Sequence, residues 1–212
     1  MRASGLDDNP GLGVGVGDLY IHVLWVMGAT AFSHFIAAND IVEYMGRKHP
    51  SAFSHIALIF EWQHGPALIG ESLVKRGIRL KPYEALKAAR ARGEVVRYYH
   101  DRLDLDQEAA MKIWWAFCET FGKPYDHIHL LFLLWYIRAK GRTMEEIPAI
   151  LRYAENNRYI CIEAVLEWLD VVEGLVEEYL GKIATRVTST PESAFYARYG
   201  LPSMAALGRF HQ

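Results

Sequence analysis

The chain has 212 residues, of which 51% are hydrophobic and 23% charged, and its formal net charge is −2. A chain of this length can bury one sizeable core, and this composition excludes a disordered protein, a collagen and a disulfide scaffold. Because basic and acidic residues nearly balance, charge gives no support for binding nucleic acid, and we expect no nucleic-acid partner.

The N-terminal part of the chain does not have the pattern of a targeting signal. Residues 1–17 are polar and then glycine-rich, without the ordered basic, apolar and small residues of a signal peptide, and are predicted to form a flexible leader. Residues 19–39 carry no charge over the length of a membrane span. His22 and His34 dilute this run and flanking basic residues are missing, so we expect a core helix here and no membrane contact.

Proline, glycine and capping residues recur along the chain and divide it into expected helices. Asp106, for example, could cap a helix that Gly122 ends, and Pro82 could open the preceding one. No long run of alternating β-branched residues indicates a sheet. The expected helices span residues 18–45, 51–64, 66–76, 82–103, 106–121, 124–141 and 157–180. The sequence therefore predicts an all-α, single-domain multi-helix bundle over residues 18–184.

The last segment, residues 185–212, is interpreted as a C-terminal arm. Thr190 and Pro191 have the form of a helix start, and a short helix is expected from Pro191 to Tyr199. Aromatic residues on both sides of the glycine and prolines of this arm could cover the body of the protein or a second copy. The arm is thus the expected surface for any homo-oligomer.

Two cysteines, Cys118 and Cys161, are the only ones in the chain. Both lie in apolar helical patterns, where cysteine usually behaves as a small hydrophobic residue. Two such residues form neither a disulfide framework nor a zinc site with CxxC spacing. A reducing, cytoplasmic location is therefore expected, and both cysteines are interpreted as core residues.

Histidines that lie three residues after a carboxylate are the feature with the most chemical content. Glu61 precedes His64, and Asp126 precedes His129, each by one turn of a helix. Two such pairs, with one further carboxylate from each of two other helices, bind iron in carboxylate-bridged di-iron bundles. Glu43 and Glu163 are the candidates for the two further carboxylates. The expected metal ligands are therefore Glu43, Glu61, His64, Asp126, His129 and Glu163.

A second arrangement shares one of these residues. The order His64, then His100 with Asp101, then Asp170 resembles the HD-domain metal phosphohydrolases in residue order and rough spacing. The resemblance covers four positions, and it implies a divalent metal and a phosphate-bearing substrate.

The function that we favour from the sequence is a metal-dependent enzyme, a non-haem di-iron oxidoreductase with its site inside the bundle. Iron or another divalent metal is the expected cofactor, and a small molecule is the expected substrate. A metal phosphohydrolase and a non-catalytic helical interaction protein remain the alternatives. The sequence assigns no catalytic residue.

Overall fold

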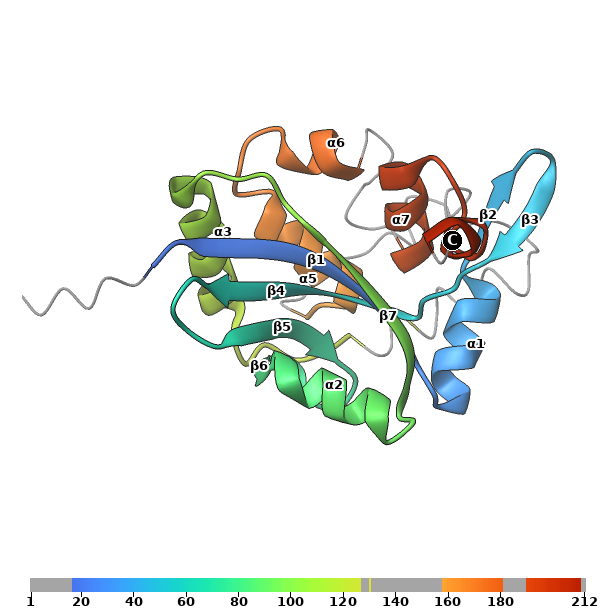
Figure 1. The fold of residues 1–212 in the computed structure, drawn as a ribbon, viewed down its shortest axis with the longest axis horizontal. Helices are drawn as coiled ribbons and strands as arrows, with labels where there is room; N and C mark the ends of the chain where they lie inside the picture. The colour runs from blue at the N-terminus through green and yellow to red at the C-terminus, as the bar shows by residue number, and fades with distance from the viewer. Residues whose placement is uncertain (1–16, 127–129, 131–157, 181–189, 211–212) are drawn as a thin grey trace, which may run out of the picture.

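The computed structural model describes residues 17–126, 130, 158–180 and 190–210, and an antiparallel sheet lies at the centre of these residues (Figure 1). In spatial order its five strands are β6 (Gly77–Pro82), β5 (Ala67–Leu73), β4 (His55–Trp62), β1 (Leu19–Gly28) and β7 (Val95–Arg102). The protein is therefore a mixed α/β structure, and the predicted all-α bundle is wrong.

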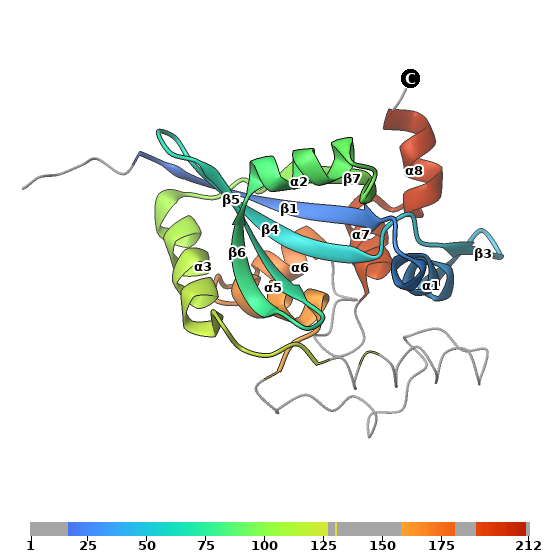
Figure 2. The same cartoon turned by 90° about the horizontal axis from the view of Figure 1, so that it is seen from below.

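Helices cover both faces of this sheet, as the view in Figure 2 makes clear. Helix α2 (Tyr83–Ala91) lies on one face, and α3 (Gln107–Thr120) and α5 (Cys161–Leu169) lie on the other. The remaining elements are α1 (Ala31–Asn39), β2 (Ile41–Tyr44), β3 (Arg47–Pro50), α6 (Leu175–Leu180), α7 (Pro191–Tyr199) and α8 (Ser203–Phe210). Strands β2 and β3 form a separate two-stranded sheet.

The central strands explain why the sequence suggested helices. Along β1, Val23 and Trp25 enter the larger core, whereas Leu24 and Val26 enter the smaller core beneath α2. A strand that is buried on both faces shows a continuous apolar run in place of alternation. The charge-free segment is thus β1 followed by α1 and not one core helix, and residues 51–64 contain strand β4 and not a helix.

Aromatic packing joins α3 and α5 to the sheet in the larger core. The Phe117 ring lies 5.1 Å from that of Phe60 on β4 and 5.2 Å from that of Trp168 on α5. The indole nitrogen of Trp168 also donates a hydrogen bond of 2.7 Å to Thr120. These contacts hold α5 against β4, so the first residue of α5 has a defined place relative to the sheet.

Several predicted helix ends are confirmed. Asp106 caps α3, its side chain accepting from the Ala109 amide at 2.8 Å, and α7 spans Pro191–Tyr199 as expected. Pro82 precedes α2, although this helix ends at Ala91 and the chain then enters β7. The long helix expected over residues 157–180 is divided into α5 and α6, and most of the helix expected over 124–141 lies outside the described residues.

The described part of the C-terminal arm packs against the body of its own chain. The buried Glu192 of α7 donates its amide to Asp40 at 3.0 Å, and the Ala52 amide donates to Ser203 of α8 at 2.7 Å. Among the residues that the structure describes, no helix combines the length and the apolar character that crossing a membrane requires.

Candidate functional site

Cys161 is the first residue of α5, with Ile160 as the capping position. The Glu163 carboxylate accepts a hydrogen bond of 2.9 Å from the Ile160 amide and so fixes the start of this helix. The first amides of a helix lack intrahelical partners and create a region of partial positive charge. The thiol of Cys161, in a residue only 8% exposed, therefore lies beside groups that favour negative charge.

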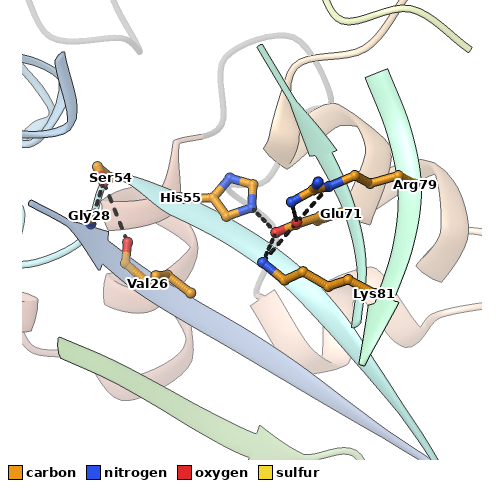
Figure 3. A network of polar contacts seen from close by, with 7 residues as sticks. All are labelled: Val26, Gly28, Ser54, His55, Glu71, Arg79 and Lys81. Carbon is orange, nitrogen blue, oxygen red and sulfur yellow. Dashed lines mark hydrogen bonds and ion pairs between the residues drawn. The ribbon is translucent and has the colours of Figure 1, made fainter. Parts of the chain in front are cut away.

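His55, the first residue of β4, interacts electrostatically with the Cys161 side chain, which raises the pKa of its imidazole. Its Nε2 lies 3.3 Å from Oε2 of Glu71 on the neighbouring strand β5 (Figure 3). Because Nε2 faces the carboxylate, Nδ1 is the ring nitrogen left for the sulfur. A thiol, an imidazole and a carboxylate are thereby connected in series where β4 begins and β5 ends.

Backbone and hydroxyl contacts fix the position of this imidazole. Ser54, immediately before His55, donates its amide to the Val26 carbonyl at 3.0 Å, and its hydroxyl lies 3.5 Å from both that carbonyl and the Gly28 amide. Figure 3 shows these contacts joining the start of β4 to the end of β1. The strand that carries His55 is thus held on one side by β1 and on the other by β5.

Glu71 is a buried carboxylate with several cationic partners. Arg79, its cross-strand neighbour on β6, donates to Oε1 from Nε at 3.0 Å and from Nη2 at 2.7 Å. Lys81 donates to Oε2 at 3.0 Å (Figure 3). The Glu71 side chain is only 2% exposed. Such a set of charged donors stabilises the ionised carboxylate inside the protein.

The pKa values of the pair reflect this arrangement. Burial alone lowers the pKa of His55, but hydrogen bonds and charge interactions with Cys161 and Glu71 outweigh it and raise the pKa to about 9. Burial alone raises the pKa of Glu71, but His55 and Lys81 hold it well below its ordinary value. At neutral pH the imidazole is therefore protonated and the carboxylate ionised.

Tyr125 brings a phenol to the same place. Its hydroxyl oxygen accepts a hydrogen bond from the Cys161 amide, and burial followed by the charge of Cys161 raises its pKa well above 10. The phenol consequently keeps its proton and can donate it to an oxygen bound near the sulfur. With its oxygen accepting from the Cys161 amide, the Tyr125 hydroxyl is the donor placed to stabilise an oxyanion here.

A close backbone approach positions Tyr125. Gly77, with φ +65°, lies against the Lys123 carbonyl, and a Cβ at this glycine would be 2.2 Å from that oxygen. The Ile78 amide donates to the same carbonyl at 2.8 Å. Only glycine fits this position without strain, and the close contact joins the segment leading to Tyr125 to the start of β6.

A cavity of about 630 Å³ opens beside these groups. His55, Ser72 and Tyr125 line it on the side of the thiol, and basic side chains together with residues of α1 and α2 line the rest. Ser72 also donates to the Tyr159 carbonyl at 2.8 Å, which connects β5 with the chain just before α5. The cavity gives a substrate a route to the imidazole and the phenol.

The structure disperses the metal ligands that the sequence suggested. Glu61 lies near the far end of β4 from His55 and bonds to His22 of β1 at 2.9 Å, and His64 lies in the turn that follows. The other described candidates are Glu43, exposed on β2, Asp126, buried after α3, and Glu163 at the start of α5. His129 lies outside the described residues.

Within those residues no group of three or more histidines, cysteines and carboxylates could hold a metal ion. The helical-bundle iron enzyme is therefore wrong, because the described residues form a mixed α/β structure and contain no such group of ligands. The HD-type arrangement fails for the same reason. His100 and Asp101 are consecutive on β7, so their side chains point to opposite faces of the sheet, and Asp170 follows the end of α5.

Sequence reasoning missed the three residues that the structure brings together: His55, Glu71 and Cys161. The apolar residues around Cys161 suggested a core position, which its burial matches, but the same residue begins a helix. A signal was present, because a cysteine accompanied by histidines elsewhere in the chain is a general candidate for a nucleophile. Nothing in the spacing of His55, Glu71 and Cys161 shows that they meet.

Comparison with known proteins adds no functional assignment. No protein-family model matches the chain, and no curated protein sequence matches it significantly. The function must therefore be argued from the geometry of the site.

Proposed function

We propose that the protein is a thiol-dependent acyl-transfer enzyme, a hydrolase where water is the acceptor, with Cys161 as its nucleophile. The observation that carries this proposal is the buried pair of His55 and Glu71, hydrogen-bonded at 3.3 Å, together with Cys161, which begins a helix and whose side chain interacts with the imidazole. A nucleophile, a base within hydrogen-bonding reach and a third group that orients the base form the arrangement by which covalent catalysis is recognised on unrelated folds.

In the first half of the reaction, the Cys161 thiolate attacks the carbonyl carbon of the substrate and forms a carbon–sulfur bond. The carbonyl electron pair moves to oxygen, where the Tyr125 hydroxyl donates a hydrogen bond and stabilises the charge. As the carbonyl reforms, the bond to the leaving amine or alcohol breaks, and protonated His55 gives that group its proton. The products are a thioester on Cys161 and the free leaving group.

In the second half, His55 removes a proton from water, and the resulting hydroxide attacks the thioester carbonyl. The carbon–sulfur bond breaks, the carboxylic acid leaves, and the thiolate and imidazolium pair is restored. Glu71 keeps the ring of His55 oriented through Nε2 and stabilises its positive charge in both halves. Arg79 and Lys81 in turn hold this carboxylate in place.

The test uses the two cysteines of the chain as each other's reference. Cys118 is partly exposed, and burial raises the pKa of its thiol. Despite lying deeper, Cys161 should react with iodoacetamide at pH 7 at least about tenfold faster than Cys118, because a thiolate reacts and a thiol does not. Mass spectrometry of peptides from partly labelled protein measures both rates in one sample.

The variant His55→Ala should remove this advantage, and Tyr83→Phe, a change on the α2 side away from the thiol, should preserve it. Labelling of Cys118 at an equal or greater rate in the native protein would overturn the proposal. A loss of the advantage with both variants would also contradict it, since Tyr83 has no role in the site.

The pH dependence gives a second readout. The ion pair needs a protonated His55, whose pKa is raised to about 9. We expect the ratio of the Cys161 rate to that of a small free thiol in solution to change as the pH rises through about 9, because the charge beside the sulfur changes when His55 loses its proton. A ratio that stays constant from pH 6 to pH 10 would contradict the assignment of His55.

A further inference from the structure

The cavity lined by His55 and Tyr125 contains more positive than negative charge among the residues that the structure describes. Four basic side chains line it: Arg76, Arg79, Lys81 and Arg92. Among the residues that the structure describes, two carboxylates pair with them, Glu94 in the lining and the buried Glu71. The lining therefore carries a surplus of positive charge even before protonated His55 is considered.

The cations differ in how far they are neutralised. Arg92 forms two hydrogen bonds with Glu94, at 2.7 and 2.9 Å, and is thereby balanced. Arg79 and Lys81 share the single charge of Glu71, and Glu71 also interacts with His55. Their side chains are 26% and 23% exposed, so each keeps some access to the cavity.

Arg76 is the cation with the least compensation. It lies exposed in the turn between β5 and β6, and no carboxylate partner is found for it among the residues that the structure describes. Its amide donates to the Leu73 carbonyl at 3.0 Å, so a hydrogen-bonded turn holds the backbone that presents it. An arginine without a partner at the rim of a concave site is suited to bind a carboxylate with two parallel hydrogen bonds.

We propose that the site takes acyl substrates that carry a carboxylate close to the bond that is cleaved. The inference rests on the proposed function, since it describes what the same thiol attacks. Arg76, Arg79 and Lys81 form an anion-binding wall in the same cavity as His55 and Tyr125. A substrate carboxylate bound there supplies the negative charge that the cavity lacks, and it fixes the carbonyl beside the sulfur.

Two alkylating reagents of similar size test this inference. Iodoacetate carries a carboxylate next to its reactive carbon, and iodoacetamide carries a neutral amide in the same place. We measure the ratio of the two rates at Cys161 and at Cys118 in the same protein, at pH 7 and low salt. The ratio should be about tenfold higher at Cys161 and should decline with added sodium chloride, because the attraction is electrostatic.

The variant Arg76→Gln should lower the ratio of the iodoacetate rate to the iodoacetamide rate at Cys161 about threefold, because the reagent's carboxylate loses one cationic partner. The matched control is Lys75→Gln, which removes the same charge from the adjacent exposed residue, one that does not line the cavity. Lys75→Gln should give the same ratio at Cys161 as the native protein, within experimental error. Both changes are at exposed positions of a turn, so the fold should be retained.

The outcomes separate the two proposals. In one outcome, iodoacetamide labels Cys161 rapidly but the ratio of the iodoacetate rate to the iodoacetamide rate is the same at Cys161 and Cys118. This outcome overturns the carboxylate preference and retains the proposed thiol chemistry. An equal effect of Lys75→Gln and Arg76→Gln also overturns it, because it shows a general surface charge in place of a binding wall. Failure of both reagents to label Cys161 overturns the proposed function and this inference with it.

Discussion

Two regions of the molecule bury carboxylates, and they shift the pKa values of these carboxylates in opposite directions. At the candidate site, Glu71 is surrounded by Arg79, Lys81 and His55, and its pKa lies well below the ordinary value. Between the body and the C-terminal helices, burial raises the pKa of Asp40 to about 7. Both acids are almost fully buried, so burial alone does not decide which form each adopts.

The partners account for the difference. The contacts that favour ionised Asp40 come from neutral groups, the Thr190 hydroxyl and the Glu192 amide, while the nearby Glu192 carboxylate opposes its charge. Burial raises the pKa of Glu192 as well, although Ser203 donates to it from both its amide and its hydroxyl. The first region holds a fixed charge suited to orienting an imidazole, and the second is a pH-sensitive contact between segments.

Of the substitutions that test this comparison, the isosteric change Glu71→Gln should have the largest effect on the stability of the protein. Removing one buried charge leaves Arg79 and Lys81 without their counter-ion, and we expect the free energy of unfolding to fall by about 3–5 kcal/mol at pH 7. Urea denaturation measures this loss. Glu84→Gln, which breaks an exposed pair with Lys87, is the control and should change stability very little. Similar losses in the two variants would show that Glu71 is not a buried counter-ion.

Replacing a carboxylate by its amide in the second region should have the opposite effect and stabilise the protein. Folded Asp40 holds its proton up to about pH 7, whereas the unfolded chain releases it near 3.8. The stabilising contribution of protonated Asp40 is therefore complete below pH 3.8. It is lost as the pH rises to about 7, because the unfolded chain releases this proton first. Asp40→Asn should remain neutral throughout and stabilise the protein at pH 8 by about 1–3 kcal/mol relative to native, with almost no effect at pH 4.

Thermal unfolding across the pH range, carried out in parallel for native protein and Asp40→Asn, measures this difference. The curves should separate between pH 4 and pH 7 and stay parallel above it. A variant that is destabilised at pH 8 would mean that Asp40 is ionised in the folded state and that its environment resembles that of Glu71.

The variant Thr190→Ala should lower the free energy of unfolding by a smaller amount. Thr190 caps α7 by accepting from the Ser193 amide at 3.0 Å, and loss of such a cap costs about 1 kcal/mol. It also hydrogen-bonds Asp40 and lowers that pKa, so the variant should move the pH-dependent loss of stability upward. Thr30→Ala removes the equivalent cap of α1, at 3.1 Å from Ser33, and should cost as much without moving the pH dependence. Equal pH profiles in both variants would exclude a direct contact with Asp40.

The sequence contained local signals for the helix ends and little information on the sheet. Asp106 at the start of α3 and Thr190 with Pro191 at the start of α7 act through contacts within four residues, and these predictions are confirmed. Strands β1 and β4 were misassigned because side chains on both of their faces are buried, which removes the alternation that identifies a strand.

The candidate site could not be predicted from local sequence patterns for a related reason. Each of its residues has a common structural explanation taken alone: Cys161 as a small apolar residue, His55 beside an apolar strand, and Glu71 within another. Their chemistry arises from the pairing of β4 with β5 and from the docking of α5 on both strands. These are long-range contacts, and the sequence supplied neither the register nor the partner element.

The hydrogen bond between Ser72 and Tyr159 spans 87 residues of chain, and the site forms only where such distant segments meet. During synthesis the strands that carry the imidazole and the carboxylate leave the ribosome long before the cysteine does. The emerging N-terminal part can build its sheet, since β1 to β7 precede α3, but it lacks Cys161. The proposed site is therefore complete only after α5 has docked on the sheet, so recovery of Cys161 reactivity would report complete refolding.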